Sequence, residues 1–375
     1  MPEVRDPMIT YCTNIHPGES WDEIFLNVRT HLPAVKAAVS PDAPFPIGLR
    51  LSNRAAIDLD AEASALFQEW CREAGCFVPT INGFPYGVFH GRPVKESVYL
   101  PDWRQEERVE YTKRLAYLLD AWLPEGMAGS ISTVPVGFKR KVRPDDYAAV
   151  RRNLLGVLEH LDLLRQRSGK EIVLCLEPEA GCVLETTEDL VRFIEQMGFP
   201  RALGNMMGIC FDCCHHAVAF ENVPEAFAML SEAGVKIGKI QASSALRLKS
   251  FDRTLLDGLD EPCYLHQVVI RHPEGRLARY DDLPEALDRH HIALGEEWRI
   301  HFHVPVFAED TVSYGTTRFF LEECLQRMDG NIPIEVETYT WDVLPAELRS
   351  ASVTESIIRE IEWVKEKSHE TNRRS

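Results

Sequence analysis

Apolar and polar residues alternate along the chain in blocks that predict strands and helices in turn. Short apolar runs predict buried strands at residues 9–14, 46–52, 76–83, 130–137, 171–176, 208–212, 235–242, 299–307 and 332–338. Between them, apolar residues recur at a helical period, which predicts helices at residues 19–39, 60–75, 103–123, 144–168, 187–197, 224–233, 317–328 and 353–365. Strands that alternate with helices in this way are typical of a parallel α/β fold.

This order of elements favours a (β/α)8 TIM barrel. Eight strand–helix units close such a barrel, and a chain of 375 residues is long enough for one with insertions. Nine strands are predicted, so one is extra, and we expect it in an insertion at residues 243–298, which contains YLHQVVIR, or in the HFHVP segment that follows. A doubly wound sheet is the rival fold, but no GxGxxG turn follows the first strand. We expect one domain over residues 1–375, with a frayed tail at residues 367–375.

Composition and charge narrow the class of protein. Hydrophobic residues make up 45% of the chain and charged residues 26%, as in soluble globular proteins. Neither an apolar run long enough to span a membrane nor a secretory signal is visible, and the ten cysteines are scattered without a CxxC pair. The net charge of -17 opposes a nucleic-acid interface, which needs clustered lysine and arginine. We therefore expect a cytoplasmic protein with reduced thiols that inserts into no membrane and binds no nucleic acid.

Carboxylate and imidazole side chains gather where the predicted strands end. In the stretch GICFDCCHHA, Asp212 ends an apolar run and His215 follows three residues later. Several other candidates occur in pairs two residues apart, which places both members on one face of a strand. In a TIM barrel, chemistry lies at these carboxyl-terminal strand ends. The full set is Glu177, Glu179, Asp212, His215, Gln241, His301, His303, Glu335 and Glu337.

This set predicts a divalent metal site. A charge inside a barrel is unfavourable unless it is paired or binds a metal. Mixed carboxylate and imidazole ligands suit Mn²⁺, Zn²⁺, Fe²⁺ or Co²⁺, and they suit Mg²⁺ less well. Each residue also has an ordinary alternative: Asp212 could cap the next helix, Glu179 could be a surface carboxylate, and Gln241 could satisfy a backbone group. His301 could pack against a helix if His303 faces the barrel mouth.

Other residues are candidates for a substrate pocket. They are His16, which precedes a Pro-Gly turn, Asn82 before an aromatic, glycine-rich loop, His301, and Lys139. Lys139 opens the basic run KRKVR, which could bind a phosphate group on a substrate, although such a run is more often a solvated loop. A nucleophile is disfavoured, because Cys213 and Cys214 lack a hydrolase context and no GxSxG elbow is present.

The order of the motifs resembles a known superfamily. LCLEPE, CFDCCHHA, KIQASSAL, HFHVP and IEVETYTW follow one another as in the xylose-isomerase-like barrels, which include sugar-phosphate isomerases, epimerases and endonuclease IV enzymes. YCTNIHPGESW, HFHVP and EVETYTWDVLP resemble, more closely, the EboE family of metabolite traffic proteins. The superfamily resemblance implies metal ligands at Glu177, Asp212 and one of Glu335 and Glu337, with His215 matching an Asp-x-x-His pattern.

One departure from the superfamily concerns the number of ligands. Gln241 stands where many members have a histidine, so we add Gln241 itself, as an oxygen ligand, and His303, as a compensating imidazole, to the expected set. The family name reports an association with the export of secondary metabolites and names no reaction.

Together these features lead us to expect a metal-dependent isomerase or epimerase. Its substrate would be a small polyhydroxylated metabolite (a sugar, sugar phosphate or cyclitol) in the synthesis or export of a secondary-metabolite precursor. The metal would stabilise an enediolate, and the expected catalytic residues are Glu177, Glu337 and Glu179. A metabolite-binding barrel without turnover and a related hydrolase, lyase or dehydratase are the alternatives; a nuclease is the least supported. The polar stretch after residue 243 could form a lid, a surface for a partner or a contact in a homo-oligomer.

Overall fold

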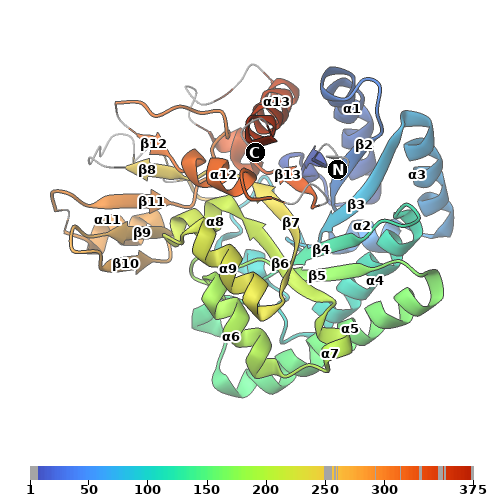
Figure 1. Cartoon of the computed structure of the whole chain (residues 1–375), viewed down its shortest axis with the longest axis horizontal. Coiled ribbons are helices and arrows are strands. Elements are labelled where there is room, and N and C mark those ends of the chain that lie inside the picture. Colours follow the sequence, from blue (N-terminus) through green and yellow to red (C-terminus); the bar gives the residue numbers. More distant parts are fainter. Residues whose placement is uncertain are drawn as a thin grey trace.

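The computed structural model describes residues 7–248, 256, 259, 261–291, 293–312, 314–328, 332–344, 349 and 352–372. Within this part of the chain, eight parallel strands form a nearly closed barrel, in the order β1-β13-β7-β6-β5-β4-β3-β2 (Figure 1). The strands are β1 (Ile9–Tyr11), β2 (Phe45–Arg50), β3 (Cys76–Asn82), β4 (Gly129–Thr133), β5 (Ile172–Leu176), β6 (Met207–Asp212), β7 (Lys236–Ala242) and β13 (Ile334–Val336). The predicted TIM barrel is confirmed.

The two strands that end the order, β1 and β2, meet through few contacts. A parallel bridge joins Cys12 to Gly48, and the Thr10 hydroxyl donates to the carbonyl of Pro46 at 2.7 Å. Gly48 is needed here, because a Cβ atom at this position would lie 1.9 Å from Oε1 of Glu335. The barrel therefore leaves room for the side chain of Glu335 in its interior, at the place where β1 and β2 meet.

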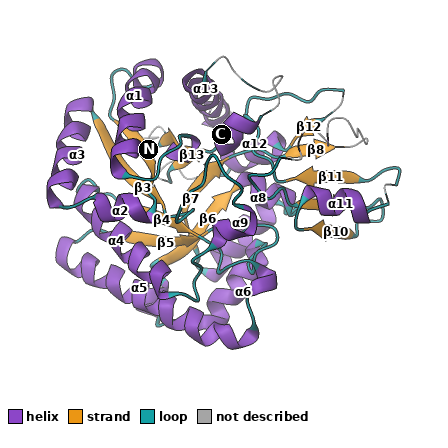
Figure 2. Ribbon diagram, turned by 180° about the vertical axis from the view of Figure 1, so that it is seen from behind, coloured by secondary structure: helices purple, strands orange, loops and turns teal. Residues whose placement is uncertain are grey.

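Helices surround the strands (Figure 2). Several begin and end as capping rules predict: the Ser20 side chain and Glu23 form a capping box at the start of α1, and Gly75 ends α3 in the left-handed conformation. The helices are α1 (Trp21–Val39), α2 (Asn53–Asp58), α3 (Ala61–Ala74), α4 (Glu106–Trp122), α5 (Tyr147–Ser168), α6 (Thr187–Met197), α7 (Arg201–Gly204), α8 (Cys213–Val218), α9 (Val223–Ala233), α11 (Leu283–Arg289), α12 (Arg318–Leu325) and α13 (Val353–Asn372). Short 3-10 turns are η1 (Thr13–Ile15), η2 (Lys95–Tyr99), η3 (Lys139–Lys141), η4 (Pro144–Asp146) and η5 (Tyr339–Val343).

The insertion after β7 is a second, antiparallel sheet that lies beside the barrel in both views (Figures 1 and 2). Its five strands, among the described residues, run in the order β10-β9-β11-β8-β12 and surround apolar side chains of their own, such as Leu248, Ile270 and Trp298. They are β8 (Leu246–Leu248), β9 (Val268–Arg271), β10 (Leu277–Tyr280), β11 (Glu297–Ile300) and β12 (Gly315–Thr316). An insertion after the seventh barrel strand is confirmed. One extra strand was predicted, but the described residues form five, and the inserted sheet extends to Thr316, beyond the predicted end at residue 298.

Two further boundaries differ from the prediction. The run at residues 299–307 was expected to be one strand; β11 ends at Ile300, and His301 to Val304 form a loop that leaves the inserted sheet. The last helix continues to Asn372, so residues 367–372 of the expected tail are helical, and residues 373–375 lie outside the described part. No described helix has the length and apolar character needed to cross a membrane. The division into a single domain stays a prediction.

Candidate active site

Three carboxyl groups meet at the carboxyl-terminal end of the barrel strands. Glu177 follows β5, Asp212 ends β6 and Glu337 follows β13, and each places an oxygen within 4.8 Å of the others. All three side chains are buried. Burial, followed by the charge of Asp212, raises the pKa of Glu177 well above its usual value, and burial, followed by Glu177, does the same to the pKa of Glu337. Burial and mutual repulsion therefore disfavour the ionised forms of Glu177 and Glu337, and a cation among the three groups would favour them.

Asp212 is the carboxylate that ionises most readily. Its Oδ1 caps α8 and accepts from the amide of His215 at 2.9 Å and from the hydroxyl of Ser243 at 2.8 Å. Burial by itself would raise the pKa of Asp212, but the imidazoles of His215 and His303 and these hydrogen bonds lower it. Its other oxygen, Oδ2, has no hydrogen-bond partner among the described residues. One oxygen thus serves the helix cap, and the other is left for a ligand.

Two imidazoles present a free nitrogen to the same place. Nδ1 of His303 donates to the carbonyl of Glu337 at 2.8 Å, and Nδ1 of His215 donates to the carbonyl of Pro178 at 3.1 Å. Because a carbonyl only accepts, both rings carry their hydrogen on Nδ1 and leave Nε2 as a lone pair. Nε2 of His215 lies 3.8 Å from Oδ2 of Asp212, and Asp212, His215 and His303 each place a potential ligand atom within 4.8 Å of the others. Burial lowers the pKa of His215 to about 4, so this ring is neutral at pH 7.

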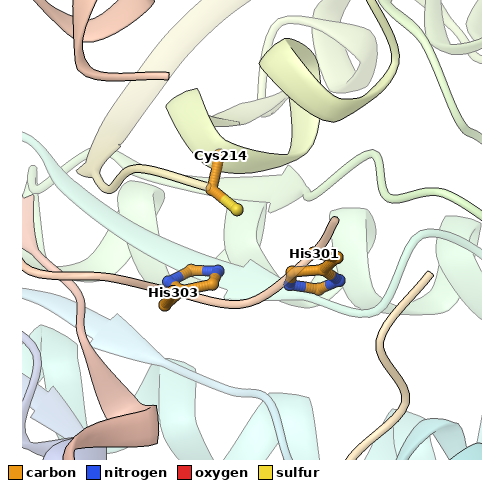
Figure 3. Close-up of side chains that lie close together, drawn as sticks. All are labelled: Cys214, His301 and His303. Carbon is orange, nitrogen blue, oxygen red and sulfur yellow. The ribbon is translucent and has the colours of Figure 1, made fainter. Parts of the chain in front are cut away.

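A thiol borders the histidines. Figure 3 shows the sulfur of Cys214, at the start of α8, pointing toward the rings of His301 and His303, and the three residues have potential ligand atoms within 4.8 Å of one another. Burial raises the pKa of Cys214 well above its usual value, which keeps the thiol protonated. A protonated thiol is a poor nucleophile.

Glu179 lies in a separate hydrogen-bonded group beside the carboxyl cluster. It accepts from the Tyr99 hydroxyl at 2.7 Å and from Nε2 of Gln267 at 3.0 Å, and burial raises its pKa to about 7 against the lowering effect of these bonds. The other end of the Gln267 amide accepts from Nδ1 of His301 at 2.6 Å. Gln267 therefore fixes His301 and Glu179 next to one another, with their side chains 3.4 Å apart.

The structure separates the two C-terminal glutamates. Glu335 lies within β13, deeper in the barrel, where its Oε2 is 2.5 Å from Nζ of Lys239. Oε1 of Glu337 accepts from the side-chain amides of Asn14 at 2.7 Å and Asn82 at 3.2 Å. Glu337, and not Glu335, therefore joins the carboxyl cluster, and Asn82 contacts this cluster through Glu337.

Two other predicted site residues, His16 and Lys139, lie apart from the carboxyl cluster. A third, Gln241, makes no polar contact with it. His16 is buried and stacks on His31 at a ring distance of 4.3 Å. Lys139 is exposed on η3, with its ammonium 3.5 Å from Glu185. Gln241 is buried in β7, in register with Asp212, and neither polar atom of its amide finds a hydrogen-bond partner among the described residues.

A pocket opens above the carboxyl groups, and sequence reasoning missed several residues that build it. Tyr99 lies in a 3-10 turn, and Tyr264 lies in the inserted segment before β9, where no strand-end pattern pointed to it. Gln267 lies in the same segment and bonds to Glu179. Asn14 falls in a run read as strand, although the chain there is a 3-10 turn. The pocket is lined by Asn14, Phe84, Pro85, Phe89, Val94, Lys95, Val98, Tyr99, Glu177, Glu179, His215, Tyr264, Leu265, His301, Glu337 and Tyr339.

Comparison with known proteins agrees with this architecture. Residues 45–305 match the family model described as xylose isomerase-like TIM barrel. The chain belongs to this family. As a xylose isomerase-like barrel, it carries its candidate site where parallel barrels carry theirs, at the carboxyl ends of the strands. No curated protein matches the sequence.

Solved structures show the same fold at low sequence identity. The chain is similar to a xylose isomerase domain protein from Planctomyces limnophilus, with 15% identity over 99% of both chains and a TM-score of 0.54. It is similar to a xylose isomerase-like TIM barrel protein from Mycobacterium smegmatis in complex with magnesium, with 13% identity over 99% of both chains and a TM-score of 0.54. An L-ribulose 3-epimerase shares 12% identity over 99% of this chain and 97% of its own, with a TM-score of 0.51.

Proposed function

We propose that this xylose isomerase-like barrel is a metal-dependent isomerase or epimerase that acts on a small polyhydroxylated metabolite. The observation that carries the proposal is the buried cluster of Glu177, Asp212 and Glu337. Lys239, the lysine whose charge acts on Glu177 and Glu337, is already paired with Glu335. An L-ribulose 3-epimerase with this fold supports the reaction class. The sequence resemblance to the EboE family leads us to place the substrate in the synthesis or export of a secondary-metabolite precursor.

The residues present fit a divalent cation. Buried atoms without a hydrogen-bond partner in the described part of the chain face the cluster: Oε2 of Glu177, Oδ2 of Asp212 and Nε2 of His303. Together with Glu337 and His215, they form a mixed oxygen and nitrogen donor set, which suits Mn²⁺, Zn²⁺, Fe²⁺ or Co²⁺ better than Mg²⁺. When bound, such a cation supplies Lewis-acid stabilisation of negative charge that develops on a substrate oxygen.

Glu179 is the residue that we assign to proton transfer. Its pKa of about 7 allows it to take a proton and to return it near neutral pH. Tyr99 and Gln267 hold its carboxylate in place, and it lines the pocket beside His301. Glu335 has no part in this step, because its carboxylate is paired with Lys239 beneath the site.

Metal analysis combined with isotope exchange tests the proposal. We expect stoichiometric Mn, Zn, Fe or Co in the wild-type protein and its loss in Asp212→Asn and Glu337→Gln. Glu179→Gln should keep the metal but lose the exchange of solvent deuterium into the substrate selected from a panel of aldoses, ketoses and cyclitols. Glu159→Gln, an exposed change on α5, is the control and should alter neither quantity. A wild-type protein that takes up no metal when it is supplied would overturn the proposal.

A further inference from the structure

The pocket above the carboxyl groups has one strongly aromatic wall. Phe89, Tyr264 and Tyr339 come from three distant segments, yet their ring centres lie 5.1 Å to 5.2 Å from one another. All three rings line the pocket, together with Val94 and Leu265. A ligand gains from this wall to the extent that it brings apolar surface to it, and a flat aromatic group brings more than a hydroxylated sugar does.

The same pocket lacks a site for a phosphate group. Lys95 is the only lysine or arginine among its described lining residues, and its ammonium is 2.8 Å from Oδ2 of Asp282 and 3.4 Å from the carbonyl of Glu261. The amino terminus of α8 is occupied by the carboxylate of Asp212. Phosphate recognition needs free cationic or amide donors, and here it would also meet the charge of the carboxyl cluster.

The pocket therefore has two ends of different chemistry. Glu177, Glu179, His215, His301 and Glu337 form a polar end that hydroxyl groups can satisfy. The aromatic wall forms the other end, and the structure places Tyr339 at the junction, since its hydroxyl lies 3.4 Å from Nε2 of His301. A ligand that fills both ends must itself be polar at one end and flat and apolar at the other.

We infer that the substrate is an unphosphorylated hydroxylated compound that carries an aromatic or similarly flat apolar group. Its hydroxyl-bearing end lies over the carboxyl cluster, and its flat group contacts Phe89, Tyr264 and Tyr339. This inference rests on the proposed function and names the substrate class of the same site. The phosphate role considered for Lys139 has no place in it, because Lys139 pairs with Glu185 outside the pocket.

Three matched probes test the inference on the zinc-loaded full-length protein. We would measure the dissociation constants of 1-phenyl-1,2-ethanediol, glycerol and glycerol 3-phosphate by saturation-transfer NMR. We expect the phenyl diol to bind at least about tenfold more tightly than glycerol, and glycerol 3-phosphate to bind no more tightly than glycerol. Phe89→Leu should remove most of the preference for the phenyl diol and leave glycerol binding unchanged. Tyr117→Ala, which removes an exposed ring on α4, is the matched control and should change neither.

Several outcomes would overturn the inference. For the wild type, they are equal binding of the phenyl diol and glycerol, tighter binding of glycerol 3-phosphate than of glycerol, or no binding of the phenyl diol at 20 mM, a concentration that we choose. For the variant, it is a Phe89→Leu protein that keeps the full preference for the phenyl diol. Failure of the proposed function is a different result: the protein would take up no metal, or Glu179→Gln would retain isotope exchange, whatever the order of the three probes.

Discussion

At the scale of single residues, position along a strand decides the chemistry of Glu335 and Glu337. They are two residues apart, with Glu335 inside β13 and Glu337 directly after it. Glu335 is deeper and meets Lys239, whereas Glu337 is at the barrel mouth, where Asn14 and Asn82 hold it among other carboxyl groups. Two identical side chains therefore separate into a structural ion pair and a ligand candidate.

The buried ion pair can be tested by removing its cation. Lys239→Met should lower the free energy of unfolding by about 3–5 kcal/mol, because the carboxylate of Glu335 then stays in the interior without its partner. The double variant Lys239→Met, Glu335→Gln should recover most of this loss. Urea denaturation of the three proteins measures both effects, and a Lys239→Met variant as stable as the wild type would contradict the assignment.

Gln241 provides a second test at this scale. Its buried amide makes no hydrogen bond with the described residues and lies in register with Asp212, so Gln241→His would add an imidazole beside the carboxyl cluster. We expect metal affinity to rise about tenfold, as measured by competition with a chelator. Gln241→Met, which fills similar space without a ligand atom, is the control. Equal affinities of the histidine and methionine variants would show that this position lies out of reach of the metal.

At the scale of elements, α13 holds two loops that carry site residues. Glu360 of α13 accepts from the amide of Val306, which follows the HFHVP loop, at 3.1 Å, and from the hydroxyl of Thr338, next to Glu337, at 2.7 Å. Burial raises the pKa of Glu360 to about 7 despite these bonds. The protonated form therefore suits the folded protein better than the ionised form.

The sign of the resulting pH dependence follows from this raised pKa. The stability from protonated Glu360 is fully present below its unfolded pKa of 4.5 and is lost as the pH rises to about 7. Glu360→Gln should therefore exceed the wild type in free energy of unfolding by about 3 kcal/mol at pH 8, and this advantage should vanish near pH 4. Chemical denaturation at several pH values measures the difference. A difference that stays constant over this range would contradict the raised pKa.

At the scale of the whole molecule, the site joins the barrel to its insertion. The barrel strands supply Glu177, Asp212 and Glu337, and the insertion supplies Gln267 and His303. A cation bound among residues from both parts would stabilise only the folded arrangement. The stability of the whole protein should then depend on the metal.

Removal of the metal tests this dependence. With the metal at about 100 times its dissociation constant, the free energy of unfolding should be higher by roughly 3 kcal/mol than after treatment with EDTA. Calorimetry with and without EDTA measures the change for the wild type, and Asp212→Asn should respond to neither metal nor chelator. If EDTA leaves the melting temperature of a metal-containing wild type unchanged, the cation does not couple the two parts.

The amino-acid sequence by itself was sufficient to predict the barrel, the place of its insertion and the carboxylates at the strand ends. These features depend on local patterns: apolar runs, helical periods, and the polar residue at which each run stops. The ends of elements were less certain, as α13 illustrates, because packing against the barrel extends a helix past its apolar pattern.

Only the tertiary structure decided which side chains share one site. Asn14 and Glu337 are 323 residues apart and Gln267 and Glu179 are 88 residues apart, and no local pattern links such pairs. The sequence placed His301 and His303 on one predicted strand and left open which of them faces the pocket. In the structure they lie in a loop, where the period of a strand no longer fixes direction, and both rings turn toward the site. Strand register and the paths of the loops are set when the whole molecule packs. The fold therefore decides which residues belong to the site.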